Sequence, residues 1–193
     1  MNTAARSRVY APPDSPVLAG IGHVDPTWLA RRLGAPTLRV LDVRTDSRAS
    51  DESGTRLRRP SRRGPPSVYL DGHVPGAVTL DVRASLFDAR GDVISAPELA
   101  MVMSGLGVGD QHTIVLVDEG SRDGALALAA AWALGRYGHS DVHVLEGGFA
   151  RWVGEGRAVS PELTRHAPAS YTAKVPNGGG VSDLRGPRLR TAT

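Results

Sequence analysis

Short runs of branched apolar residues alternate along this chain with segments that have the pattern of helices, and this alternation most restricts the fold. The runs have the length of strands and lie at residues 38–43, 77–80, 113–117 and 142–145. The helical patterns cover residues 27–33, 95–103, 125–137 and 149–153. Strands that alternate with helices predict an α/β fold with a mostly parallel sheet, covered by helices on both faces.

The 193 residues allow one domain of about 100–150 residues with appendages. We expect an irregular lead-in over residues 1–19, a domain over 20–157 and a tail or linker remnant over 158–193. The tail has almost no apolar clusters, so we expect it to bury no core. Residues 47–67 break all periodicity and are expected to form an insertion within the domain.

Basic residues are concentrated outside the predicted domain core. Segments 1–24, 47–67 and 156–193 together carry a net charge of +9, which leaves −6 on the rest of the chain. An acidic folded body argues against nucleic acid as a partner. The arginines of the insertion (Arg56, Arg58, Arg59, Arg62, Arg63) predict a solvated segment; binding of phosphate or acidic protein, or folding back on the acidic core, are the alternatives.

The chain contains no cysteine. This excludes disulfides, thiolate metal sites and any mechanism with a thiol nucleophile. The six histidines lack metal-ligand spacing, so we expect no metal, and nothing indicates a cofactor. No apolar run reaches about 20 residues and the first residues lack a signal peptide's apolar core, which predicts no membrane segment and a cytoplasmic location.

Two strand ends are candidate sites, because ligands bind beyond the carboxyl ends of strands in an open parallel sheet. The first is the loop after residues 113–117, which leads into a helix and whose backbone N–H groups point to anion binding. This loop consists of Asp118, Glu119, Gly120, Ser121, Arg122, Asp123 and Gly124. The second site carries Asp42 and Arg44.

Four motifs in this order resemble the rhodanese (sulfurtransferase) family over residues 20–157. They are the strand end at 40–44, the Gly-His-Val-Pro-Gly-Ala turn at 72–77, the strand and loop at 114–124, and the segment 145–152 with its Gly-Gly-Phe. The resemblance implies a rhodanese-like three-layer fold. It also implies that the loop after the strand should begin with a Cys that carries sulfur as a persulfide.

Asp118 stands where the family has this Cys, so the chain alone should not transfer sulfur. The carboxylates of Asp118, Glu119 and Asp123 beside Arg122 should also repel dianions such as thiosulfate. An Asp at this place is similar to the non-catalytic first half of two-domain thiosulfate and 3-mercaptopyruvate sulfurtransferases. Trp132 and the pair Gly138-His139 strengthen the similarity to that half.

Other roles for these residues are open. Asp118 as a nucleophile or general base is an alternative to an inert loop residue, but no second Asp follows at motif spacing and no metal cluster is visible in the sequence. We expect His73 to pack within its turn rather than act as an acid or base, and Asp42 and Arg44 to form an ion pair rather than a substrate clamp. Trp132 and Trp152 are expected in the core.

Two functions from different classes follow. The chain is either the structural half of a sulfurtransferase whose Cys lies on a rhodanese domain of another chain, or a stand-alone inactive module that binds a protein or small anion for regulation. The Asp118 loop and Trp132 favour the first. In both cases the chain is a pseudoenzyme.

Overall fold

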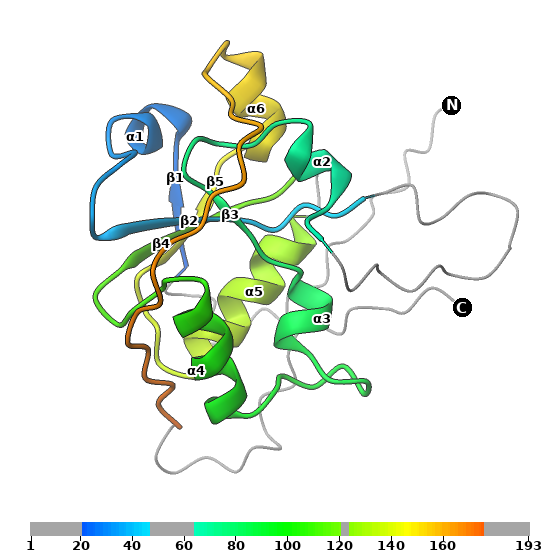
Figure 1. Cartoon of the computed structure of the whole chain (residues 1–193), viewed down its shortest axis with the longest axis vertical. Coiled ribbons are helices and arrows are strands. Elements are labelled where there is room, and N and C mark those ends of the chain that lie inside the picture. Colours follow the sequence, from blue (N-terminus) through cyan, green and yellow to red (C-terminus); the bar gives the residue numbers. More distant parts are fainter. Residues whose placement is uncertain (1–20, 47–63, 121–123, 176–193) are drawn as a thin grey trace, which may run out of the picture.

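A computed structural model describes residues 21–46, 64–120 and 124–175. These residues form five strands and six helices (Figure 1). In chain order the elements are β1 (Gly22–Val24), α1 (Pro26–Ala30), β2 (Leu38–Asp42), α2 (Ser67–Leu70), β3 (Val78–Thr79), α3 (Val82–Leu86), α4 (Ala96–Gly105), β4 (Thr113–Val117), α5 (Ala125–Arg136), β5 (Val142–Leu145) and α6 (Gly148–Gly154).

The five strands form one sheet in the order β1-β5-β4-β2-β3, and every pair is parallel. β4 lies at the centre and pairs with β2 over five residues, from Thr113 opposite Leu38 to Val117 opposite Asp42. Parallel neighbours need crossovers, and the helices between strands supply them. The predicted mostly parallel sheet is confirmed.

Helices cover both faces of the sheet, which confirms the predicted three-layer arrangement. Along β4, Ile114 and Leu116 join a core with α3, α4 and α5, whereas Val115 and Val117 join a second core with α1 and α6. This split follows from the alternation of side chains in a strand. In Figure 1 α3, α4 and α5 lie in the lower half of the molecule and α1 and α6 in the upper half. Trp132 and Trp152 are buried, one in each core, as expected.

Local sequence signals explain where two helices begin. Asp25 caps α1 by accepting a hydrogen bond of 2.8 Å from the Trp28 N–H. At α4 the Glu98 carboxylate accepts from both the backbone N–H and the hydroxyl of Ser95, at 2.9 and 2.7 Å. Ser95 and Glu98 therefore form a capping box at the start of α4.

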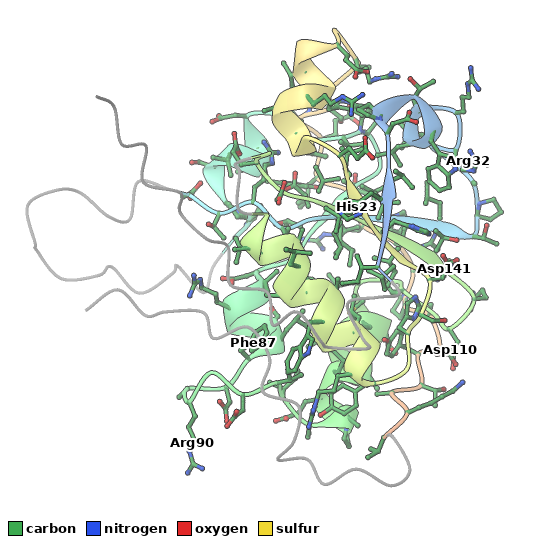
Figure 2. The ribbon with its side chains drawn as sticks, turned by 180° about the vertical axis from the view of Figure 1, so that it is seen from behind. His23, Arg32, Phe87, Arg90, Asp110 and Asp141 are labelled. Atoms are coloured by element: carbon green, nitrogen blue, oxygen red, sulfur yellow. The ribbon has the colours of Figure 1, made fainter. Side chains whose placement is uncertain are left out.

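Three short elements, β1, α2 and α3, were not predicted. β1 has three residues and α2 has four, too few to display a period. α3 has five residues and begins after Asp81, whose side chain accepts from the Ala84 N–H at 3.0 Å. The loop after α3 carries Arg90 and projects from the body of the molecule (Figure 2). Of the insertion expected over 47–67, residues 47–63 lie outside the described residues, and Ser67 opens α2.

Residues 158–175, which we name the strap, differ from the tail expected from the sequence. The strap leaves α6 and runs across the sheet to a position beside α4, in orange in Figure 1. Ser160 and His73 exchange two backbone hydrogen bonds, and farther along the Lys174 N–H donates to the Tyr137 carbonyl at 2.8 Å. Tyr171 is only 7% exposed and joins the core of α3, α4 and α5. Long-range contacts fix this segment, and they leave no periodic signal in its sequence. The lead-in at 1–19 and the rest of the expected tail lie outside the described residues.

Candidate functional site

The two predicted strand ends lie next to each other at the carboxyl edge of the sheet. The parallel pairing of β2 with β4 sets Asp42 opposite Val117, so the residues that follow both strands share one edge. The first turn of α6 completes this region, because the Phe149 N–H donates to the Asp118 carbonyl at 2.8 Å and the Ala150 N–H to the Glu119 carbonyl at 3.2 Å. The structure therefore brings together the loop after β4, the end of β2 and the Gly-Gly-Phe motif.

The Arg44 guanidinium is the point at which the four motifs meet. Its Nη2 lies 2.7 Å from Asp42 Oδ2 and donates to the Gly72 carbonyl at 2.6 Å. Its Cζ lies 3.6 Å from the centre of the Phe149 ring, an attractive cation–π arrangement. Its Nη1 lies 4.0 Å from Glu119 Oε2. One side chain thus joins the end of β2, the turn at 72–77, the loop after β4 and α6.

Asp42 and Arg44 form a buried ion pair, the arrangement favoured from the sequence over a substrate clamp. Arg44 is 4% exposed and Asp42 is fully buried. Nε of Arg44 lies 3.0 Å from both carboxylate oxygens of Asp42, which makes the contact multidentate. Because the Asp42 carboxylate and the Gly72 carbonyl already occupy this guanidinium, Arg44 does not offer a free charge to an incoming anion.

Asp118 is buried at the start of the loop, with 7% of its surface exposed. Its Oδ1 accepts a hydrogen bond of 2.9 Å from the Gly120 N–H. Burial raises the pKa of the Asp118 carboxyl, the Gly120 hydrogen bond opposes this increase, and the charge of Asp42 adds to it. No described cation forms an ion pair with Asp118, so the loop provides a carboxyl group in a poorly hydrated place.

Glycines allow close contact between the loop after β4 and the start of α6. Gly148 has a φ of +55°, and a Cβ there would collide with the Gly120 backbone N–H and lie 2.5 Å from Asp118 Oδ1. Gly120 has a φ of +86°, and a Cβ there would collide with the Gly147 carbonyl. The sequence motif of this glycine pair and Phe149 indicated a family resemblance, but their part in the site was not predicted.

The remaining loop residues add negative rather than positive charge to the described site. The Glu119 side chain is 61% exposed at the rim. Ser121, Arg122 and Asp123 lie outside the described residues, and Gly124 begins the turn into α5 with a φ of +44°. Within the described residues, Asp118 and Glu119 are therefore the carboxylates expected to repel dianions.

His73 is packed within its own turn, as expected. Its ring is fully buried and stacks on Tyr69, with ring centres 3.7 Å apart. Its Nδ1 lies 2.8 Å from the Tyr69 carbonyl oxygen, while its Nε2 has no partner among the described residues. The contacts of His73 are thus with α2 and the strap rather than with the Asp118 loop.

The described residues contain neither a metal-binding cluster nor a helix able to span a membrane. Within residues 21–46, 64–120 and 124–175, no group of three or more His, Asp or Glu side chains is placed to hold a metal ion. In the same ranges no helix has the length and apolar character needed to cross a membrane.

Comparisons with known proteins identify relatives of this arrangement. A putative thiosulfate sulfurtransferase of Mycolicibacterium smegmatis is 36% identical over 112 residues, which are 58% of this chain and 40% of that protein. The sulfur carrier protein TtuD of Thermus thermophilus is 31% identical over 149 residues, 77% of this chain and 45% of that protein. The chain therefore spans less than half the length of these two relatives.

Solved structures share the fold. The crystal structure of SseA from Escherichia coli superposes with a TM-score of 0.61 at 24% identity, over 81% of this chain and 56% of that one. The 3-mercaptopyruvate sulfurtransferase of Leishmania major gives a TM-score of 0.58 at 21% identity, over 84% and 41%. The family model for the rhodanese-like domain matches residues 25–155, which include every element from α1 to α6. This chain belongs to the rhodanese-like domain family.

Proposed function

We propose that this chain is the cysteine-free, structural half of a sulfurtransferase and contributes a domain face to a site whose Cys lies on a second rhodanese domain, on another chain. The observation that carries the proposal is the buried Asp118 at the end of β4, held by the Gly120 N–H in a chain without any Cys. A carboxylate cannot hold sulfane sulfur as a persulfide, because that intermediate requires a thiolate. In these terms the domain is a pseudoenzyme.

The contacts of Arg44 and Asp118 support a structural role for the site over a catalytic one. Arg44, the cation at the described site, is buried and occupied by Asp42 and Gly72. Asp118 has no described base, metal or cation beside it that would make it a nucleophile. The chain's likeness to proteins named thiosulfate sulfurtransferases makes thiosulfate the first sulfur donor to test on the assembled pair. A cytoplasmic location remains a prediction of this proposal.

Isolation of the chain from its source cells under native conditions, with mass spectrometry of what accompanies it, tests for the partner. Recovery of a Cys-bearing rhodanese domain in equal amount is the expected result. Recovery of an unrelated protein instead would favour the alternative, a stand-alone rhodanese-like regulatory module, and would overturn the proposed split enzyme.

A thiosulfate-to-cyanide assay then tests whether the chain is inactive alone and increases the activity of its Cys-bearing partner. The purified chain alone should form thiocyanate at the background rate. Adding it to the recovered Cys-bearing domain should raise kcat/KM for thiosulfate in a saturable way. Turnover by the chain alone, or no effect of the chain on its partner, would contradict the proposal.

Two variants make the assay specific for the candidate site. Glu119→Arg reverses a 61% exposed charge at the rim and should weaken the effect on the partner. Arg90→Glu is the matched control, because Arg90 lies on the projecting loop after α3 (Figure 2) and should leave the effect unchanged. Equal behaviour of the two variants would place the partner elsewhere on the domain.

A further inference from the structure

A separate pocket lies beneath the strap, away from the candidate site. Its volume is about 290 Å³, and it is lined by the connection 33–36, the first residues of β2, the Pro75–Gly76 turn and His166 of the strap. Leu38 and Val40 provide an apolar floor and belong to the core of α1 and α6. This volume is at the small end of the range for ligand pockets, so its occupant would be a short group.

Arg39 is one of the lining residues, and no described side chain neutralises its charge. Its Nε donates to the Gly107 carbonyl at 2.8 Å, and its Nη1 donates to the carbonyls of Pro36 and Leu38 at 3.0 and 2.8 Å. All three acceptors are backbone carbonyls, which hold the guanidinium in place but carry no full negative charge. Its Nη2 has no hydrogen-bond partner among the described residues and keeps its N–H groups for another acceptor.

The contrast with Arg44 shows what is missing at Arg39. Both arginines belong to the β2 segment and both donate to backbone carbonyls, but Arg44 also has the Asp42 carboxylate as a multidentate partner. The described residues that line the pocket include no acidic side chain, and the second titratable group there is His166. Partial burial also lowers the pKa of Arg39, as expected for a cation without a counter-charge.

The wall formed by the strap is closely fitted to the domain. Gly107 has a φ of +74°, and a Cβ there would collide with Cβ of His166 and approach the Ala167 carbonyl to 2.8 Å. His166 Nε2 in turn lies 3.4 Å from the oxygen of the Gly76 carbonyl, and both residues line the pocket. The strap therefore holds His166 at the pocket in a defined position.

We propose that this pocket binds a carboxylate carried on a short branched apolar body, with the Arg39 guanidinium as the partner of the carboxylate and Leu38 and Val40 under the apolar part. The planar guanidinium matches a carboxylate in geometry and charge. A small free acid and the C-terminus of a peptide that ends in Leu share this chemistry. The proposal is independent of the proposed function, because the pocket adjoins the start of β2 and the candidate site adjoins its end.

An NMR titration of the isotope-labelled full chain tests the proposal with four probes. They are 4-methylpentanoate, its neutral amide, N-acetyl-Gly-Leu with a free carboxylate, and the same peptide as an amide. We expect at least one carboxylate to bind with a Kd of about 1 mM or tighter, a value within reach of such small molecules. Its amide should bind at least about tenfold more weakly, and the His166 ring signals should shift. Tighter binding of the free acid or of the peptide distinguishes the two sources.

Three variants show whether binding depends on this pocket. Arg39→Gln should weaken carboxylate binding about tenfold or more, whereas Arg83→Gln, an equal loss of charge at an exposed position on α3, should not. Ala35→Phe fills the pocket while keeping Arg39, so it tests the site even where Arg39→Gln fails to fold. The proposal is overturned if the chain binds no carboxylate at about 10 mM, if amides bind as tightly as acids, or if Ala35→Phe retains the wild-type affinity.

Discussion

At the scale of single residues, the buried surroundings of Asp118 disfavour its charged form. Its folded-state pKa is raised by burial, so this group adds stability when protonated at low pH and loses that contribution as the pH rises through the folded pKa. Asp118→Asn keeps an Oδ1 acceptor for the Gly120 N–H and removes the charge. The free energy of unfolding at pH 7 should rise by on the order of 1 kcal/mol.

Urea unfolding at pH 7 and pH 3.5 checks this prediction. The gain from Asp118→Asn should shrink at the lower pH, where Asp118 itself is largely protonated. Glu119→Gln is the control, because the Glu119 side chain is 61% exposed and its removal should change little. A variant less stable than wild type at pH 7 would mean that the carboxylate is stabilised by its surroundings.

A second residue-scale prediction concerns the missing thiol. Asp118→Cys alone should leave thiosulfate-to-cyanide turnover close to background, because Glu119 opposes the anion and Arg44 is bound to Asp42. Asp118→Cys combined with Glu119→Gln should be more active than the single variant. Steady-state rates of both proteins decide the matter, and robust turnover of the single variant would show that the pocket accepts dianions as it stands.

The buried pair at the end of β2 supplies a third prediction. Arg44→Met leaves Asp42 as a buried charge without its partner and should cost about 3–5 kcal/mol of unfolding free energy. The double variant Asp42→Leu/Arg44→Met should lose less, because no isolated charge remains. Chemical unfolding of both proteins provides the comparison, and a double variant as unstable as the single one would contradict the expectation.

At the scale of elements, the approach of α6 to the loop after β4 depends on glycine. Gly148→Ala should destabilise the fold by about 1–3 kcal/mol, since its φ is +55° and a Cβ would meet the Gly120 backbone. Gly154→Ala, in the last turn of the same helix and in open space, is the matched control and should be neutral or stabilising by up to about 1 kcal/mol. Thermal unfolding of both variants tests the difference, and equal melting temperatures would refute the crowding argument.

The elements also show what the sequence could and could not provide. β4 was predicted with its observed bounds, because Thr113 and the four branched apolar residues after it stand between polar ones. Asp42 and Arg44, two positions apart, were expected to pair. The other contacts of Arg44 were not predicted, because Gly72 and Phe149 reach it only through the tertiary fold. The strap was missed for the same reason, since its order comes from partners such as Tyr137 and His73.

At the scale of the whole molecule, buried histidines should make stability depend on pH. His112 and His139 are buried, and burial lowers the pKa of both. His139 stacks on Tyr171 of the strap, and Asp110 and Asp141, which partly oppose the shift, lie on the same side of the molecule (Figure 2). A lowered histidine pKa contributes stability above the ordinary value near 6.5, and this stability is lost as the pH falls from that value through the lower folded-state pKa.

We therefore expect the free energy of unfolding to decrease between pH 7.5 and pH 5.5, before most carboxylates titrate. In His139→Gln, which has no imidazole to protonate, the decrease should be smaller. Unfolding curves at both pH values, with His23→Gln at an exposed position as the control, measure the effect. An equal decrease in wild type and His139→Gln would assign the pH dependence to other groups.

The strand order has a consequence for how the chain is made. Within the described residues β1 is the first strand and pairs only with β5, the last, and Leu145 follows Val24 by 121 residues. At about 5–20 residues per second, roughly 6 to 24 s of synthesis separate the two strands on the ribosome. During that interval β1 has no partner, and the sheet closes only when nearly the whole domain has emerged. We therefore expect this domain to fold late in its synthesis. Its contacts join residues far apart in the sequence, which favours slow folding.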